Sequence, residues 1–309
     1  MKILIIKKKL LINLLLYLIV AITLSAVIIY FTSIKYKSIQ TISPVNISQT
    51  PPIDLTGDGQ KDSLQLSNAE NKIDLNITCS NDSFSLSNQI KDKTLFNTNT
   101  HWEPKIYLHD ISRDNIPEII LQGSKNNKSA CYVFHWNKKN FALVYSSNNN
   151  IFGILDCKNS KTPQCYSLSS SEGLSSLNSF MLINDYTLDT SKENSSVPSL
   201  DSVTNFINIV ELPYILDNLP DIFTSAIDKE NLSLLWSLDK DNYSYSFQNG
   251  FFYDYKWTQS GEPYAIRWRL SFEKSNLKGT LSNKTEFILI IDLEKTGSTY
   301  KINSIQKVK

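Results

Sequence analysis

The sequence of 309 residues has few of the features that mark several protein classes. Its four cysteines form no C-x-x-C pair, so a zinc ribbon and a disulfide-rich miniprotein are excluded. Glycine (9 residues) and proline (10 residues) are too rare for a fibrous or low-complexity chain, and 41% hydrophobic residues indicate a folded protein. The chain also lacks a G-x-S-x-G elbow, a P-loop, an H-E-x-x-H pair and a dinucleotide fingerprint. We therefore expect no catalysis and no bound nucleotide.

A strong basic excess is missing too, although charge is unevenly distributed along the chain. Residues 1–40 carry six lysines and no acid, whereas residues 41–309 carry 25 basic and 30 acidic residues, for a total of +1. A mildly acidic body offers no electrostatic footprint for a phosphate backbone. We therefore expect no binding of nucleic acid.

One long apolar run is present, at residues 10–34, and only Asn13 and a few hydroxyl groups interrupt it. As a helix this segment spans about 37 Å, enough to cross a hydrocarbon core of about 30 Å. The lysine cluster at residues 7–9 predicts that residues 1–9 stay in the cytoplasm and that the remainder is exported. We expect an uncleaved signal anchor, that is, a single-pass cell-membrane protein with an extracytoplasmic body. A cleaved signal peptide is the alternative, but it requires a shorter apolar region and a small-x-small site.

The exported part divides by composition into four segments. Residues 35–52 lack periodicity and predict a stalk. Residues 53–188 show short alternating segments typical of β-strands, and residues 189–201 are polar and predict a linker. In residues 202–309, helical apolar spacing is followed by four strand-like segments, which predicts an α+β domain with an antiparallel sheet. We expect Ser202 to cap the first helix, and one or two short helices after Pro220.

Two acidic loops repeat the same arrangement 56 residues apart: residues 54–62 (DLTGDGQKD) and residues 110–118 (DISRDNIPE). Alternate positions of a tight loop can direct hard oxygen ligands at one calcium ion. At loop position 6, Gly59 permits the positive φ that such a turn needs, and Asn115 is the next most tolerant residue type. Side-chain oxygens at positions 1, 3, 5 and 9 and the carbonyl at position 7 predict these calcium ligands: Asp54, Thr56, Asp58, Gln60 and Asp62 in the first loop, and Asp110, Ser112, Asp114, Ile116 and Glu118 in the second. The alternative is that both loops are Asx-rich turns without a metal.

A third loop, residues 156–164 (DCKNSKTPQ), is degraded. Lys158 stands where the other loops have a hydroxyl group, and an ammonium group would repel a divalent cation, so we expect no metal here. Cys157 and Cys165 stand at positions 2 and 10 of this loop, and a disulfide between them would close it. Unpaired, buried cysteines are the alternative.

These loops resemble the FG-GAP/VCBS repeats of integrin-like β-propellers and their bacterial surface relatives. The resemblance covers residues 50–188, and it implies four-stranded, blade-like units whose acidic loops bind structural calcium. Three units are too few to close a propeller, which typically has four to eight blades. We therefore expect a mainly β protein with about three open, propeller-like units. By order of elements alone, residues 202–309 loosely resemble NTF2-like or cystatin-like domains.

Together these features predict a membrane-anchored surface protein that serves as a binding or scaffold module. Its partners would be the membrane itself and a surface protein or a wall polymer. A cell-envelope enzyme, or an accessory to one, acting on a wall polymer through the C-terminal domain is the alternative function.

Overall fold

The computed structural model describes residues 16–18, 20, 22–25, 42–46, 53–80, 82–156, 162–278 and 283–308. The chain divides into two compact units, Met1–Thr41 and Ile42–Lys309. The second unit is mainly β, as predicted, and its strands form three open sheets rather than a closed propeller within the described ranges.

The membrane segment predicted at residues 10–34 lies largely outside the described residues. Within it, residues 16–18, 20 and 22–25 are described, and they are helical. Within the part of the chain that the structure describes, no helix has the length and the apolar character needed to span a bilayer.

The two smaller sheets come first in the chain. Sheet 1 has β2 (Lys72–Cys79) bonded to β1 (Ser63–Ala69), β3 (Asp82–Ser85) and β4 (Phe96–Asn97), and a short 3₁₀ helix, Leu86–Gln89, follows β3. Sheet 2 is an antiparallel meander of β5 (Lys105–His109), β6 (Glu118–Lys125), β7 (Lys128–Trp136) and β8 (Phe141–Ser147).

Sheet 3 has eight strands in the order β12-β11-β10-β9-β13-β14-β15-β16. Its first half is the meander β9 (Ile151–Leu155), β10 (Gln164–Leu168), β11 (Asn178–Ile183) and β12 (Tyr186–Asp189). Its second half is the meander β13 (Tyr243–Trp257), β14 (Pro263–Asn276), β15 (Lys284–Thr296) and β16 (Thr299–Lys307). The halves join where β9 and β13 pair in parallel, with Gly153 opposite Phe252.

This junction bears on the domain boundary predicted at residues 189–201. The strands on either side of that segment belong to one sheet, and both strands lie within the unit Ile42–Lys309. The segment therefore connects two halves of one unit. Part of the predicted stalk also joins this unit, because the Val45 N–H donates to the Ile106 carbonyl at 2.7 Å and Ile42 and Val45 pack against the cores.

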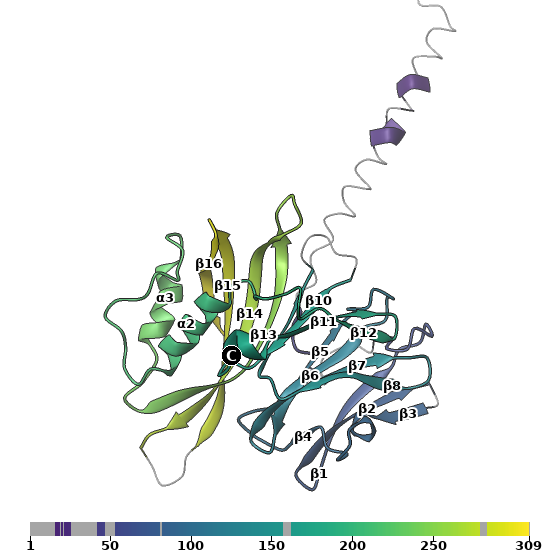
Figure 1. Ribbon diagram of the computed structural model, residues 1–309, viewed down its shortest axis with the longest axis horizontal. Coiled ribbons are helices and arrows are strands. Elements are labelled where there is room, and N and C mark those ends of the chain that lie inside the picture. Colours follow the sequence, from purple (N-terminus) through teal and green to yellow (C-terminus); the bar gives the residue numbers. More distant parts are fainter. Residues whose placement is uncertain are drawn as a thin grey trace, which may run out of the picture. The chain divides into compact units, whose positions relative to one another are not determined.

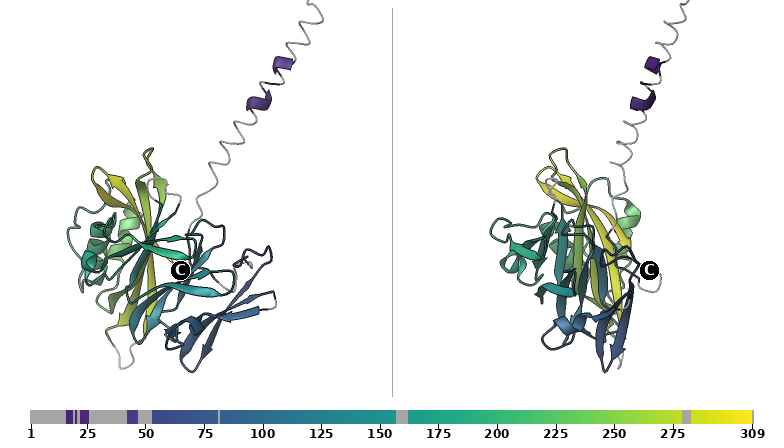
Figure 2. Two further views of the ribbon diagram at one scale, coloured as in Figure 1. Left: turned by 45° about the vertical axis from the view of Figure 1, so that its right-hand side comes forward. Right: turned by 90° about the vertical axis from the view of Figure 1, so that its right-hand side faces the viewer.

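The sheets are stacked face to face, and the alternation of side chains explains why (Figure 1 and Figure 2). In β7, Tyr132 and Phe134 pack toward sheet 1, whereas Cys131 and Val133 pack toward sheet 3. Both faces of sheet 2 are therefore covered, and its central strands β6 and β7 are buried almost throughout.

The two ends of the stack are closed differently. In β2 of sheet 1, Leu75 and Ile77 are buried, whereas the alternate residues Asp74, Asn76 and Thr78 form a polar outer face. At the other end, α2 (Leu200–Glu211) and α3 (Lys229–Trp236) cover the far face of sheet 3 (Figure 1). An open stack thus buries its apolar faces without closing into a ring.

The predicted helix after residue 202 exists, but it begins earlier than expected. Its N-cap is Ser199, whose hydroxyl group accepts from the Trp268 indole N–H at 2.9 Å. Ser202 lies within the helix and donates to the Tyr300 carbonyl, so its predicted role as a cap is wrong. One further helix, α3, follows Pro220, and Asp228 caps it by accepting the Glu230 N–H.

Candidate functional site

Each acidic loop occupies the same place in its repeat, between the first two strands of the unit. The first loop lies between Ile53, which bridges to Asp62, and β1. The second loop joins β5 to β6, and the third joins β9 to β10. The first two loops therefore occupy equivalent places in the stack of sheets, and residues 157–161 of the third loop lie outside the described residues.

The first loop is shaped by backbone groups that donate to its acids. The Asp54 carboxylate accepts from the N–H groups of Thr56, Gly57 and Gly59 at 3.1, 2.6 and 2.8 Å. Burial opposes ionisation, but these N–H groups outweigh it and lower the pKa of Asp54 below its usual value. The Asp58 carboxylate likewise accepts from the Gln60 N–H at 2.7 Å. Both side chains are therefore held inside the turn by backbone N–H groups.

Asp62, at position 9, closes this loop from its far side. It is 1% exposed, and its Oδ2 accepts from the Leu55 N–H at 2.6 Å. Among the described residues, Asp62 Oδ1 and Thr56 Oγ1 are buried without a hydrogen-bond partner. A buried, unpaired oxygen costs about 1–3 kcal/mol, and more when it is charged, so these atoms are ready ligands for a cation.

The second loop has the same backbone conformation as the first. Positions 4 and 6 have positive φ in both loops: 73° and 84° at Gly57 and Gly59, and 65° and 71° at Arg113 and Asn115. The conformation predicted for Gly59 and Asn115 is confirmed, whereas the positive φ at position 4 was not predicted. Asp110 accepts from the Asn115 N–H at 3.0 Å, and Asp114 accepts from the Ile116 N–H at 2.8 Å.

Glu118 ends the second loop as Asp62 ends the first. It is 1% exposed, and its Oε2 accepts from the N–H groups of Ile111 and Ser112 at 2.7 and 3.3 Å. Asp110 Oδ1 and Ser112 Oγ lack a hydrogen-bond partner among the described residues, as Asp62 Oδ1 and Thr56 Oγ1 do in the first loop. The two loops therefore leave comparable sets of oxygens unsatisfied.

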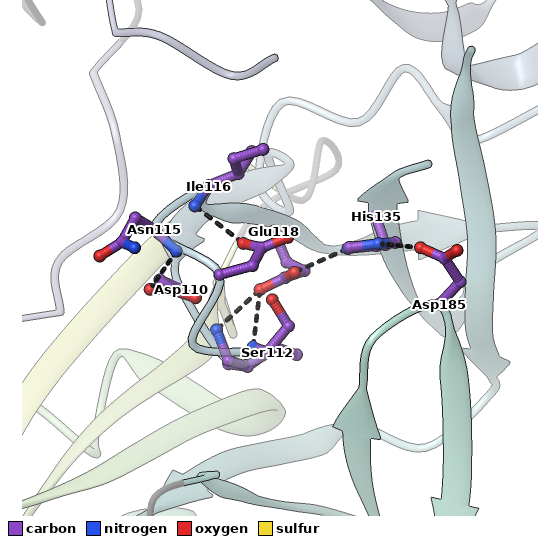
Figure 3. Close-up of polar contacts among 9 residues, drawn as sticks. Asp110, Ser112, Asn115, Ile116, Glu118, His135 and Asp185 are labelled. Atoms are coloured by element: carbon purple, nitrogen blue, oxygen red, sulfur yellow. Dashed lines mark hydrogen bonds and ion pairs between the residues drawn. The ribbon is translucent and has the colours of Figure 1, made fainter. Parts of the chain in front are cut away.

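A buried histidine that was not among the predicted ligands lies beside the second loop. His135 of β7 is 2% exposed and lies between two acids, with Nδ1 2.8 Å from Glu118 Oε1 and Nε2 3.0 Å from Asp185 Oδ1 (Figure 3). The hydrogen bond with Glu118 raises the pKa of His135, burial opposes this, and Asp185 adds to it. The signal that would have found His135 is hairpin register, because Ile119 pairs with Phe134 and places Glu118 beside His135.

In the third loop, the carboxylate of Asp156 is paired with an arginine of the second loop. The guanidinium group of Arg113, from the second loop, lies 2.7 Å from Asp156 Oδ2. The predicted disulfide is not supported by the described part: Cys165 is a free, fully buried cysteine, and Cys157 lies outside the described residues. Cys165 therefore matches the alternative of an unpaired, buried thiol.

Asp254 on β13 accepts a hydrogen bond from the backbone N–H of Asp156, at the start of the third loop. Its protonation predicts that the stability of the protein depends on pH. Burial raises the pKa of Asp254 from 3.8 to about 6, against the opposing donation of the Asp156 N–H and the Trp257 indole. The folded state then binds the proton more tightly than the unfolded state, so this group's contribution to stability is present below pH 3.8 and is lost as pH rises through about 6. Urea unfolding from pH 3.5 to 7 should therefore show the free energy of unfolding of wild type falling relative to Asp254→Asn. A constant difference between the two proteins would contradict this assignment.

The predicted ligands are thus held on their turns by backbone N–H groups: Asp54 and Asp58 on the first, and Asp110 and Asp114 on the second. Among the described residues, ligand atoms of Asp114, Glu118 and His135 lie within 4.8 Å of one another, whereas Asp54, Asp58 and Asp62 do not form such a group. The loops are also neighbours, because a Cβ added at Gly57 would lie 2.7 Å from the Ile116 side chain. In comparisons with known proteins, no family model matches the chain, and no curated protein matches it.

Proposed function

We propose that this protein is a membrane-anchored, extracytoplasmic binding or scaffold module in which calcium makes the acidic loops rigid. The observation that carries the proposal is the first loop, where Asp62 is 1% exposed and keeps one oxygen unpaired beside an equally unpaired Thr56 hydroxyl group. Calcium binds six to eight oxygens, and this loop offers carboxylate, hydroxyl and carbonyl oxygens within one turn. The apolar run at residues 10–34 supports the anchor.

The stack of sheets supports a structural role for the ion. The first loop precedes β1 of the terminal sheet, and Gly57 abuts Ile116 of the second loop. A cation at the first loop would fix the order of neighbouring loops as well as its own turn. The loops, held rigid by the cation, would then be available to bind a surface protein or a wall polymer.

The alternative function, an envelope enzyme or its accessory, requires converging carboxylates in a cavity. A cavity of about 420 Å³ lies at the N-terminus of α2 and includes Asp201 and Glu262. Glu262 is paired with Lys295 at 3.0 Å, so this cavity offers an ion pair instead of the two free acids of a hydrolase. We therefore retain the binding module as the proposal.

Thermal unfolding of the full chain in millimolar calcium and then in excess EDTA tests the proposal. Calcium at about 100 times its dissociation constant stabilises by about 2.7 kcal/mol, which moves the midpoint by several degrees. Asp54→Ala and Asp58→Ala should each abolish the shift, because they remove carboxylates of the first loop. Asp217→Ala, at an exposed position outside the loops, should keep it. The absence of a shift in wild type, with no calcium found by elemental analysis, would reduce the first loop to an Asx-rich turn.

A further inference from the structure

The second loop differs from the first in having a nitrogen donor. Asp114, Glu118 and His135 each offer a ligand atom, and these atoms lie within 4.8 Å of one another. From this geometry we infer that the second loop binds a first-row transition-metal dication of the zinc class through Asp114, Glu118 and His135. This inference does not depend on calcium at the first loop.

Each of the three ligands is already oriented by a contact that leaves one atom for the ion. The Ile111 N–H holds Glu118 Oε2, the Ile116 N–H holds Asp114 Oδ1, and Asp185 holds His135 Nε2. Glu118 Oε1 and His135 Nδ1 face each other at 2.8 Å, and a metal would replace this hydrogen bond (Figure 3). A carboxylate that receives the second nitrogen of a metal-binding histidine is the usual outer-shell arrangement. In a tetrahedral zinc site with bonds of about 2.1 Å, ligand atoms lie about 3.4 Å apart. The pair Glu118 and His135, at 2.8 Å, would therefore have to open, and any pair of ligand atoms near the 4.8 Å limit would have to close.

The unsatisfied oxygens of the same loop are a separate indication of a missing cation. Asp110 Oδ1 and Ser112 Oγ are buried and lack a hydrogen-bond partner among the described residues. The guanidinium group of Arg113 pairs with Asp156, 2.7 Å away in the third loop, and the imidazole of His135 is the basic group that contacts Glu118.

The histidine determines which cation the second loop favours. Calcium is a hard ion that takes oxygen ligands, whereas imidazole suits zinc and its first-row neighbours. Hairpin register gives the first loop Cys79 beside Asp62, where the second loop has His135 beside Glu118. Of these two loops, the second has an imidazole at this position and the first does not, so the equivalent loops differ in the ion that they favour.

Calorimetric titration of the metal-stripped full chain with zinc, in millimolar calcium, tests the inference. We expect one zinc ion per chain. Loss of an outer-shell partner weakens metal binding by roughly 10- to 100-fold. Asp185→Asn should weaken zinc binding within that range, and His135→Gln should weaken it by more. His101→Gln is the matched control, because His101 pairs with Glu273 at 3.0 Å and lies outside the loops. Cobalt in place of zinc should give visible absorption bands that His135→Gln removes.

Asp114→Asn guards against a folding defect in the buried variant, because Asp114 is exposed and its replacement keeps the side-chain shape. Zinc binding that is lost in Asp114→Asn and His135→Gln and kept in His101→Gln supports the inference. Zinc binding unchanged in both loop variants, zinc binding lost in His101→Gln alone, or no zinc binding at all overturns it. Calcium binding that survives His135→Gln belongs to the first loop, so the two proposals fail separately.

Discussion

Replacing Gly153 with alanine should destabilise the protein more than any other single methyl group added to sheet 3. The new Cβ would lie 2.3 Å from the Phe252 ring, across the parallel pairing of β9 with β13. Phe252 is fully buried and stacks on Trp268 with ring centroids 4.3 Å apart, so the ring has little room to move. Overpacking of a tight core costs about 1–3 kcal/mol and occasionally more. Since the β9–β13 contact unites the two halves of the sheet, we expect the upper end of this range.

Urea unfolding measures this loss as a lower midpoint at constant m-value. Gly250→Ala is the matched control, because Gly250 lies on the adjoining β13 and its added Cβ would meet its nearest neighbours at 3.3 and 3.4 Å. We expect this control to remain within about 1 kcal/mol of wild type. Equal stability of the two variants would show that β9 and β13 are not tightly packed.

Replacing Lys240 with methionine should give the second large loss. Lys240 is 7% exposed, and its ammonium group donates to the carbonyl groups of Ile209, Leu212 and Tyr214 at 2.6, 2.7 and 3.2 Å. These carbonyls lie at and beyond the end of α2, where the helix has no partners of its own to offer. Methionine keeps the apolar stem and removes every donor, so we expect a cost of about 2–4 kcal/mol.

Thermal and urea unfolding of Lys240→Met should therefore show a loss well above that of Lys229→Met. Lys229 is exposed at the start of α3, and its replacement should remain within about 0.5 kcal/mol of wild type. If the two variants unfold alike, the three carbonyl contacts of Lys240 contribute nothing measurable, and α2 is held by its apolar face alone.

Local pattern was enough to predict much of the fold. The alternation in residues 53–188 and the helical spacing of Val203, Phe206 and Val210 predict the observed strands and α2, because each face that must be buried is visible in the sequence. The two acidic loops were also predictable, down to the positive φ at Gly59 and Asn115. Such features depend on neighbours within a few residues along the chain.

The caps and ends of elements were less predictable. Ser202 satisfies the pattern of an N-cap, yet the observed cap is Ser199, which Trp268 engages from another strand 69 residues away. The same holds for the segment at residues 222–224, which pairs with Ile302 of β16 instead of forming a helix. In both places a contact distant in sequence outweighs the local preference.

The sequence by itself determined the strand and helix pattern, the shape of the acidic loops and their eight side-chain ligand candidates, because each rests on residue type and spacing within one loop or element. Only the tertiary structure decided that β9 pairs with β13, that His135 and Asp185 complete the second loop, and that Arg113 neutralises Asp156 of the third. The physical reason is that those contacts join residues 17 to 99 positions apart, brought together by register and by the stacking of sheets. A single-sequence pattern carries no record of that register.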